Sequence, residues 1–173
     1  MQIGMCGPLE IRADDGELIE LPGARLRALL IALALEPGRA VPKSTLVDWI
    51  WGEQPPADAA NALQALVSRL RKVLPDGSLD VQAGGYRLAV APNAVDAVRF
   101  EKLVDQARGG DDARQAELLG EALDLWRGTF MQGVEVRDSA AVDAVITRFE
   151  GCGWPRWRIG TTRRSVSAAA PSR

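Results

Sequence analysis

The stretch that most constrains this chain is residues 58–74, DAANALQALVSRLRKVL. Its apolar residues recur with the period of an α-helix, and they are Leu63, Leu66, Val67, Leu70, Val73 and Leu74. At about 100° per residue the opposite face carries Asn61, Ala65, Ser68 and Lys72. Gln64 and Arg71 lie on one flank and Arg69 on the other. The spacing predicts a helix with one buried stripe, capped by Asp58, and with no further acid on its polar face.

The polar face of this helix has the chemistry of a nucleic-acid contact. Amide side chains pair with adenine edges and arginine pairs with guanine, and the cationic last turns suit phosphates. We therefore interpret the stretch as a recognition helix whose N-terminal part enters a DNA major groove. The alternative is an ordinary amphipathic helix with a solvated face. For Arg69 and Arg71 the alternative is an ion pair with Asp76 or with an acid of the preceding helices.

The neighbouring segments predict the context of this helix. Turn residues separate three short strand-like segments within residues 1–6, 9–12 and 18–21, which predicts a small antiparallel sheet. Helices are expected at residues 25–35 and 44–51, with Ser44 as a possible N-cap of the second and Val41 as a possible bridge to a sheet. Trp49 and Trp51 are expected to pack in the core rather than to bind a ligand.

A predicted β-hairpin follows the long helix. Residues 79–82 and 86–90 are strand-like, and Gly84-Gly85 is expected to turn between them. Helix, helix, proline-rich turn, longer helix and hairpin is the order of a winged helix-turn-helix. The predicted fold is therefore α+β: a small N-terminal sheet, three helices and a C-terminal hairpin wing.

Residues 1–91 resemble an OmpR-type winged helix, and more specifically the N-terminal module of the actinobacterial SARP, or AfsR-type, activators. The resemblance rests on GPLEIR at 7–12, LPGARLRALLIALAL at 21–35, LVDWIWGEQPPADAANALQALVSRLRKVL at 46–74 and GGYRL at 84–88. It implies a transcriptional activator of a biosynthetic gene cluster, with no cofactor. The expected partners are double-stranded DNA carrying direct repeats near a promoter, RNA polymerase, and a second copy of the chain on DNA.

The resemblance also implies roles for individual residues. Asn61, Gln64 and Ser68 match the groove-facing positions of the family, and Arg69, Arg71 and Lys72 match its basic cluster. Tyr86 and Arg87 match the wing, where Tyr86 is equally well explained as a packing residue. We expect Asn61, Gln64, Ser68 and Arg71 to face bases or nearby phosphates, and Arg69, Lys72 and Arg87 to contact mainly phosphates.

The sequence after residue 91 has a different pattern, in which helical periodicity predominates. Residues 91–94 are expected to form a linker, and residues 98–108, 113–126 and 139–149 have helical periodicity. Paired helices of this length predict an all-α, tetratricopeptide-like segment at 92–150. LLGEALDLWRG at 118–128 resembles the opening of the bacterial transcriptional activator domain. Because only three helices are present, we expect residues 95–150 to be poorly stable or to expose an apolar patch.

Charge divides the chain into three parts. The formal net charge is −2 for residues 1–91, −5 for 92–150 and +5 for 151–173. The last part contains five arginines, no acid and no apolar period, so we interpret it as foreign to the fold, by a shifted frame or otherwise, or as a basic tail. A DNA-binding surface on residues 1–91 must be a local patch, because their net charge is acidic.

Composition limits the alternatives. The absence of histidine removes His-based acid–base catalysis and most catalytic zinc sites, and no phosphate-cradling glycine loop is present, so we expect no enzyme and no bound metal. Two cysteines and no signal or spanning segment favour a cytoplasmic, nucleoid-associated protein. The remaining functional alternative is a protein-interaction scaffold that uses the winged helix and helical repeats without reading DNA.

Overall fold

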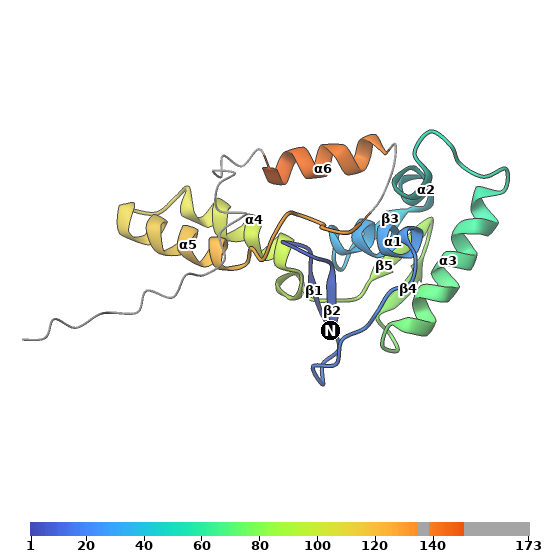
Figure 1. Ribbon diagram of the computed structural model, residues 1–173, viewed down its shortest axis with the longest axis horizontal. Helices are drawn as coiled ribbons and strands as arrows, with labels where there is room; N and C mark the ends of the chain where they lie inside the picture. Colours follow the sequence, from blue (N-terminus) through green and yellow to red (C-terminus); the bar gives the residue numbers. More distant parts are fainter. Residues whose placement is uncertain (135–138, 151–173) are drawn as a thin grey trace, which may run out of the picture.

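The computed structural model describes residues 1–134 and 139–150, and the predictions about residues 151–173 lie outside these ranges. In chain order the elements are β1 (Gln2–Gly4), β2 (Glu10–Arg12), α1 (Ala24–Ala34), β3 (Ala40–Pro42), α2 (Lys43–Trp51), α3 (Ala59–Val73), β4 (Leu79–Gln82), β5 (Gly85–Leu88), the 3-10 turn η1 (Pro92–Ala94), α4 (Asp96–Ala107), α5 (Asp112–Asp124) and α6 (Ala140–Glu150). Figure 1 shows α3 at one end of the molecule and the α4–α5 pair at the other, with α6 beside α2.

The winged helix-turn-helix is built around α1. This helix is buried from Ala28 to Ala34, and both α2 and α3 pack on it. Strands β1 and β2 form one two-stranded antiparallel sheet. A separate three-stranded sheet has the order β3-β5-β4, with every pair antiparallel. Its central strand, β5, places Tyr86 opposite both Val41 and Val81. Trp49 and Trp51 are buried, as their interpretation as packing residues requires.

The predicted recognition helix is present with the predicted faces. A carboxylate oxygen of Asp58 accepts a hydrogen bond from the Asn61 backbone N–H at 3.0 Å, so Asp58 is the N-cap. Leu63, Val67 and Leu70 are buried against the other helices. The cap and the apolar stripe therefore fix both where α3 begins and which of its faces is left to solvent.

Three local predictions were wrong. Residues 18–21 form no third strand, and Leu18 makes a single bridge to Arg12 and remains 59% exposed, so little apolar burial holds it in a sheet. Ser44 is not the N-cap, because β3 ends at Pro42 and α2 begins directly at Lys43 without a side-chain cap. The hairpin turn is Ala83-Gly84, and Gly85 belongs to β5.

The position of Gly85 follows from the close approach of β3. A Cβ at this position would overlap the backbone carbonyl of Val41, so a glycine is needed for the strands to pair here. Gly84, in the turn itself, has φ +84°, a conformation that glycine adopts without strain.

The helical half consists of the α4–α5 hairpin and α6. Asp111 caps α5 by accepting from the Arg114 backbone N–H at 2.9 Å. An aromatic cluster holds the three helices together and consists of Phe100, Trp126, Phe130 and Phe149. Phe130 and Phe149 stack with their centroids 4.3 Å apart, which joins α6 to the loop after α5.

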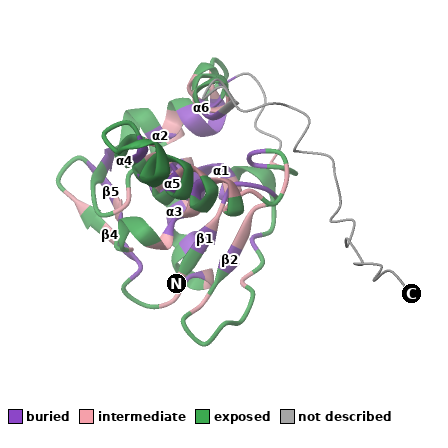
Figure 2. Cartoon of the chain, turned by 90° about the vertical axis from the view of Figure 1, so that its left-hand side faces the viewer, coloured by how far each residue is buried: buried purple, intermediate pink, exposed green. Residues whose placement is uncertain are grey.

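The expected apolar patch on this half is not observed in the described ranges. Their large exposed apolar side chains are Leu18 and Val81, both outside residues 95–150. The outer surface of α5 is mostly exposed, as its green colour in Figure 2 shows, and apart from Ala113, Ala116 and Gly120 its exposed residues are polar or charged. The expectation of low stability for this half stays a prediction. None of the described helices has the length and apolar character needed to cross a bilayer.

Candidate nucleic-acid interface

The solvent-facing side of α3 collects the residues predicted to read DNA. Its exposed side chains include Asn61, Gln64, Ser68, Arg69, Arg71 and Lys72. All six project from the side opposite the buried stripe, within about half of the helical circumference. The face therefore presents hydrogen-bonding groups in its first turns and cations in its last turns.

The three cations of α3 have no acidic partner among the described residues. Within residues 1–134 and 139–150, Arg69, Arg71 and Lys72 form no ion pair, so the alternative pairing with Asp76 is absent there. The Nε of Arg71 donates to the carbonyl oxygen of Leu79 at 3.2 Å. This bond holds the Arg71 guanidinium where α3 meets the first strand of the wing.

The two wing residues behave differently from the prediction. Tyr86 is 4% exposed and packs in the core, so the structure favours the packing interpretation over a DNA contact. Arg87 is half-buried and its Nη2 donates to a carboxylate oxygen of Asp80 at 2.6 Å. Its charge is therefore compensated within the hairpin, and phosphate contact by Arg87 gains no support from this geometry.

Lys43 is a candidate that the sequence analysis missed. It is exposed at the start of α2, its backbone N–H donates to the Gly84 carbonyl at 3.1 Å, and its Nζ lies 5.9 Å from the centre of the Tyr86 ring. These contacts place a cation beside the Ala83-Gly84 turn of the wing, and the two turn residues carry no charge themselves. The sequence contained a signal for this residue. Lys43 comes two residues after Val41, which we expected to bridge to a sheet, so pairing of that segment with the wing brings Lys43 to the wing as well.

The arrangement can bind an anionic polymer and read its edges, but it has no feature of a metal centre. Within the described ranges no group of three His, Cys, Asp or Glu side chains is placed to hold a metal ion. What the face offers is a row of amides and a hydroxyl next to three uncompensated cations. This combination suits a phosphate backbone with base edges beside it.

Two families of known proteins match separate parts of the chain. Residues 16–88 match the family described as "Transcriptional regulatory protein, C terminal", and residues 95–152 match the bacterial transcriptional activator domain. Both families are regulatory, in agreement with the prediction that the chain is not an enzyme.

Several curated regulators are similar to the chain over most of its length. The regulatory protein AfsR of Streptomyces coelicolor is 40% identical over 140 residues, covering 78% of this chain and 14% of that protein. The transcriptional regulator RedD of the same organism is 37% identical, covering 82% and 45%, and the regulatory protein DnrI of Streptomyces peucetius is 30% identical, covering 87% and 60%. The chain thus spans between about a seventh and three fifths of the length of these relatives.

A solved structure has the same architecture. Mycobacterium tuberculosis EmbR, in complex with a low-affinity phosphopeptide, superposes with a TM-score of 0.72 at 29% identity, covering 87% of this chain and 41% of that chain. This agreement confirms the predicted fold class, a winged helix followed by a helical segment. The domain order, the named relatives and the shared fold together show that the chain belongs to the SARP, or AfsR-type, family of transcriptional regulators.

Proposed function

We propose that the protein is a sequence-specific, DNA-binding activator of transcription, and that α3 enters the major groove with the β4–β5 wing beside it. Asn61, Gln64 and Ser68 would face base edges, and Arg69, Arg71 and Lys72 would face bases or phosphates. We add Lys43 as a phosphate contact next to the wing. Binding to chromosomal DNA would place the protein at the nucleoid, in the cytoplasm.

One observation carries this proposal: the exposed face of α3 holds three cations without ion pairs in the described chain and no acid after Asp58. Solvated helix faces in acidic proteins ordinarily mix both signs of charge. Residues 1–91 have a net charge of −2, so the absence of acids from this face is a local departure from the composition around it.

The proposed binding mode also predicts the partners. A winged helix of this size covers one half-site, so two copies would bind a direct repeat spaced by about one helical turn of 10–10.5 base pairs. Contact with RNA polymerase is proposed on the strength of the family, whose members are transcriptional regulators. The proposed target is the promoter of a biosynthetic gene cluster.

The test is the affinity of the full chain for duplex DNA as a function of salt concentration. A preferred sequence is first selected from random duplexes, and wild type is compared with Asn61→Ala and Lys72→Ala. Asn61→Ala is expected to cost about 1–3 kcal/mol on the preferred sequence and little on others, whereas Lys72→Ala should weaken all sequences and lower the log–log salt slope by about 1. The basic segment at 151–173 is common to all three proteins and cancels in the ratios.

The competing function is a scaffold that binds another protein. The acidic net charge of residues 1–91 is the observation that supports this alternative, and a negative binding test would select it. A folded chain that binds no duplex even at low salt would reject DNA readout and establish the scaffold reading as the one to pursue.

A further inference from the structure

The N-terminal hairpin, residues 2–12, is hydrogen-bonded to the start of the helical half. The carboxylate of Asp96, the first residue of α4, accepts the backbone N–H groups of Met5 at 2.6 Å and of Cys6 at 3.0 Å. Ile3 also forms a parallel bridge with Val95. These contacts span about 90 residues of sequence and satisfy amide groups that the hairpin leaves unpaired.

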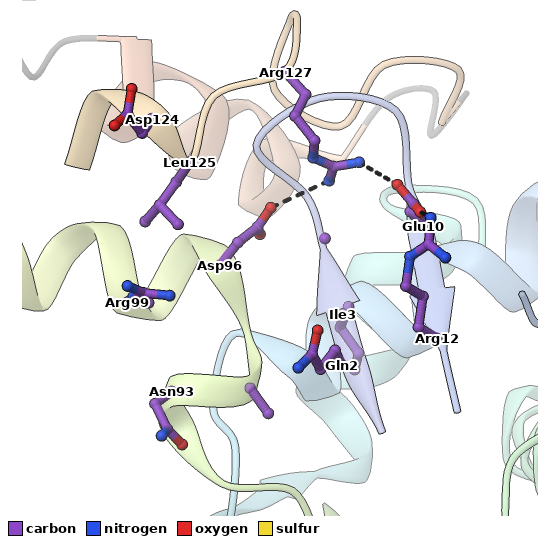
Figure 3. Close-up of a pocket in the computed structure, with 12 residues that line it drawn as sticks. Gln2, Ile3, Glu10, Arg12, Asn93, Asp96, Arg99, Asp124, Leu125 and Arg127 are labelled. Atoms are coloured by element: carbon purple, nitrogen blue, oxygen red, sulfur yellow. Dashed lines mark hydrogen bonds and ion pairs between the residues drawn. The ribbon is translucent and has the colours of Figure 1, made fainter. Parts of the chain in front are cut away.

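Arg127 closes the contact from the other side. Figure 3 shows its guanidinium between two carboxylates, with Nη1 donating to Glu10 at 2.5 Å and Nη2 to Asp96 at 3.3 Å. Its backbone N–H donates to the Cys6 carbonyl at 2.7 Å. One residue therefore binds strand β2, the start of α4 and the turn between β1 and β2.

The hairpin is shaped to receive this side chain. A Cβ on Gly4 would overlap the Arg127 guanidinium, and a Cβ on Gly7 would lie 3.0 Å from the Arg127 Cβ. Two further backbone bonds follow along the same edge, from Met131 N–H to the Met5 carbonyl at 2.9 Å and from Gln132 N–H to the Gly7 carbonyl at 3.1 Å. The segment 127–132 consists of bends and turns, with one isolated bridge from Gln132 to Pro8, and three of its backbone N–H groups donate to the hairpin.

The same segment continues to the recognition-helix module. Nη1 of Arg27, on α1, donates to the Gly133 carbonyl at 3.2 Å, and Oγ of Ser139, before α6, donates to the Asp48 carbonyl of α2 at 3.2 Å. Arg127 is the first residue of this run and its side chain is the one that reaches two carboxylates. The hairpin itself lies outside both matched family segments, which begin at residues 16 and 95.

We infer that Arg127, the arginine of the LWRG motif, is a positioning residue: by clamping the N-terminal hairpin between α4 and the segment 127–132, it fixes the helical half relative to α3. The winged helix and the helical half then move as one rigid body. The inference goes beyond the proposed function, and it does not depend on DNA binding.

The first test is amide hydrogen exchange on the full chain. Arg127→Ala is expected to raise the exchange rates of residues 2–12 at least tenfold while leaving α3 unchanged. The matched control is Arg114→Ala, which removes an ion pair of the same 2.5 Å length from α5, to Glu117, far from the hairpin. Equal exchange in the two variants would overturn the clamp. If Arg127→Ala does not fold, the exchange rates of residues 2–12 are measured in Glu10→Gln instead, which removes the charge of one of the two carboxylates that contact Arg127.

The second test measures orientation, which a merely stabilising residue would not alter. Spin labels are placed at Thr45 on α2 and Gln115 on α5, both exposed, in a Cys152→Ser background. Cys6 is buried and does not compete for the label. Wild type and Arg114→Ala are expected to give one narrow distance distribution, and Arg127→Ala one at least twice as broad.

The two tests together separate the possible outcomes. Faster exchange in the hairpin with a broader distance distribution supports the positioning role. Faster exchange with an unchanged distribution overturns it, because the hairpin would then be held without setting the orientation of α3. Neither measurement uses DNA, so both can be interpreted even if the protein does not bind DNA.

Discussion

The cations of α3 and the cation of the LWRG motif differ in how their charge is compensated. Arg69 and Lys72 point into solvent without an ion pair in the described chain, whereas Arg127 lies between Glu10 and Asp96 at hydrogen-bonding distance. Both kinds of residue are long, flexible and charged. Only the second kind is ordered by the fold itself.

The difference teaches where to look for function and where for stability. An exposed, unpaired cation contributes little to the free energy of folding, so its removal is expected to act on binding alone. A carboxylate that accepts two backbone N–H groups satisfies polar groups that folding would otherwise leave unpaired. The comparison therefore predicts that variants at the two ends of the molecule separate into binding defects and folding defects.

The largest expected effect lies at the hairpin. Asp96→Ala leaves the Met5 and Cys6 N–H groups without their acceptor and should lower the free energy of unfolding by about 3 kcal/mol. Chemical denaturation measures it. The control Asp105→Ala removes an exposed ion pair with Arg108 and should cost less than about 0.5 kcal/mol. Equal losses of unfolding free energy in the two variants would contradict the special role of Asp96 in stability.

A slightly smaller effect is expected on DNA binding. The double variant Arg69→Glu/Lys72→Glu should weaken duplex binding about 100-fold and leave the unfolding midpoint nearly unchanged. Fluorescence anisotropy with a labelled duplex measures it. The control Lys102→Glu/Arg114→Glu changes the net charge equally on the helical half. A control that weakens binding as much would mean that total charge, and not the α3 face, governs the affinity.

The pH dependence of stability sharpens the comparison within the hairpin. Burial raises the pKa of the Cys6 thiol, and the neighbouring Asp96 carboxylate adds to the rise. Above the ordinary thiol pKa of 9.0 the unfolded chain loses this proton while the folded chain keeps it, so the free energy of unfolding falls as the pH rises. The contribution of Cys6 approaches about 1.4 kcal/mol per pH unit. Denaturation at pH 8 to 10.5 should show a shallower fall for Cys6→Ala, and identical curves would contradict the shift.

The smallest expected effect is at Lys43. Lys43→Ala should weaken duplex binding by about three- to fivefold and lower the salt slope by about 1, as for one phosphate contact. The matched variant Arg87→Ala should instead act mainly on stability, because Arg87 is paired with Asp80 inside the hairpin. If Arg87→Ala weakens binding more than Lys43→Ala without unfolding the wing, the assignment of the phosphate contact returns to Arg87.

The sequence predicted the winged helix well because its signals are local. The apolar period of α3 and the Asp58 cap depend on residues that are close in the chain. The errors fell where tertiary contacts decide. Leu18 forms one bridge to Arg12 but its side chain stays exposed, and the place of Gly85 in β5 is fixed by how closely β3 approaches it.

The candidate site was predictable in its helix and not in its wing. Exposure along α3 follows from periodicity alone, so the six residues of that face were identified before the structure. The pairing of Arg87 with Asp80 depends on strand register, which places these two residues opposite one another. The clamp around Arg127 joins residues that are 31 to 121 positions apart. Local sequence periodicity does not predict contacts over such separations.

The clamp has a consequence for how the chain acquires its shape during synthesis. The hairpin at residues 2–12 is synthesised before its acceptor Asp96 and its partner segment 127–132. At a synthesis rate of about 5–20 residues per second, β1 and β2 precede these partners by several seconds. The helices α1, α2 and α3 can pack together in that interval, so the hairpin makes its contacts with Asp96 and with residues 127–132 after the helices between them have been synthesised.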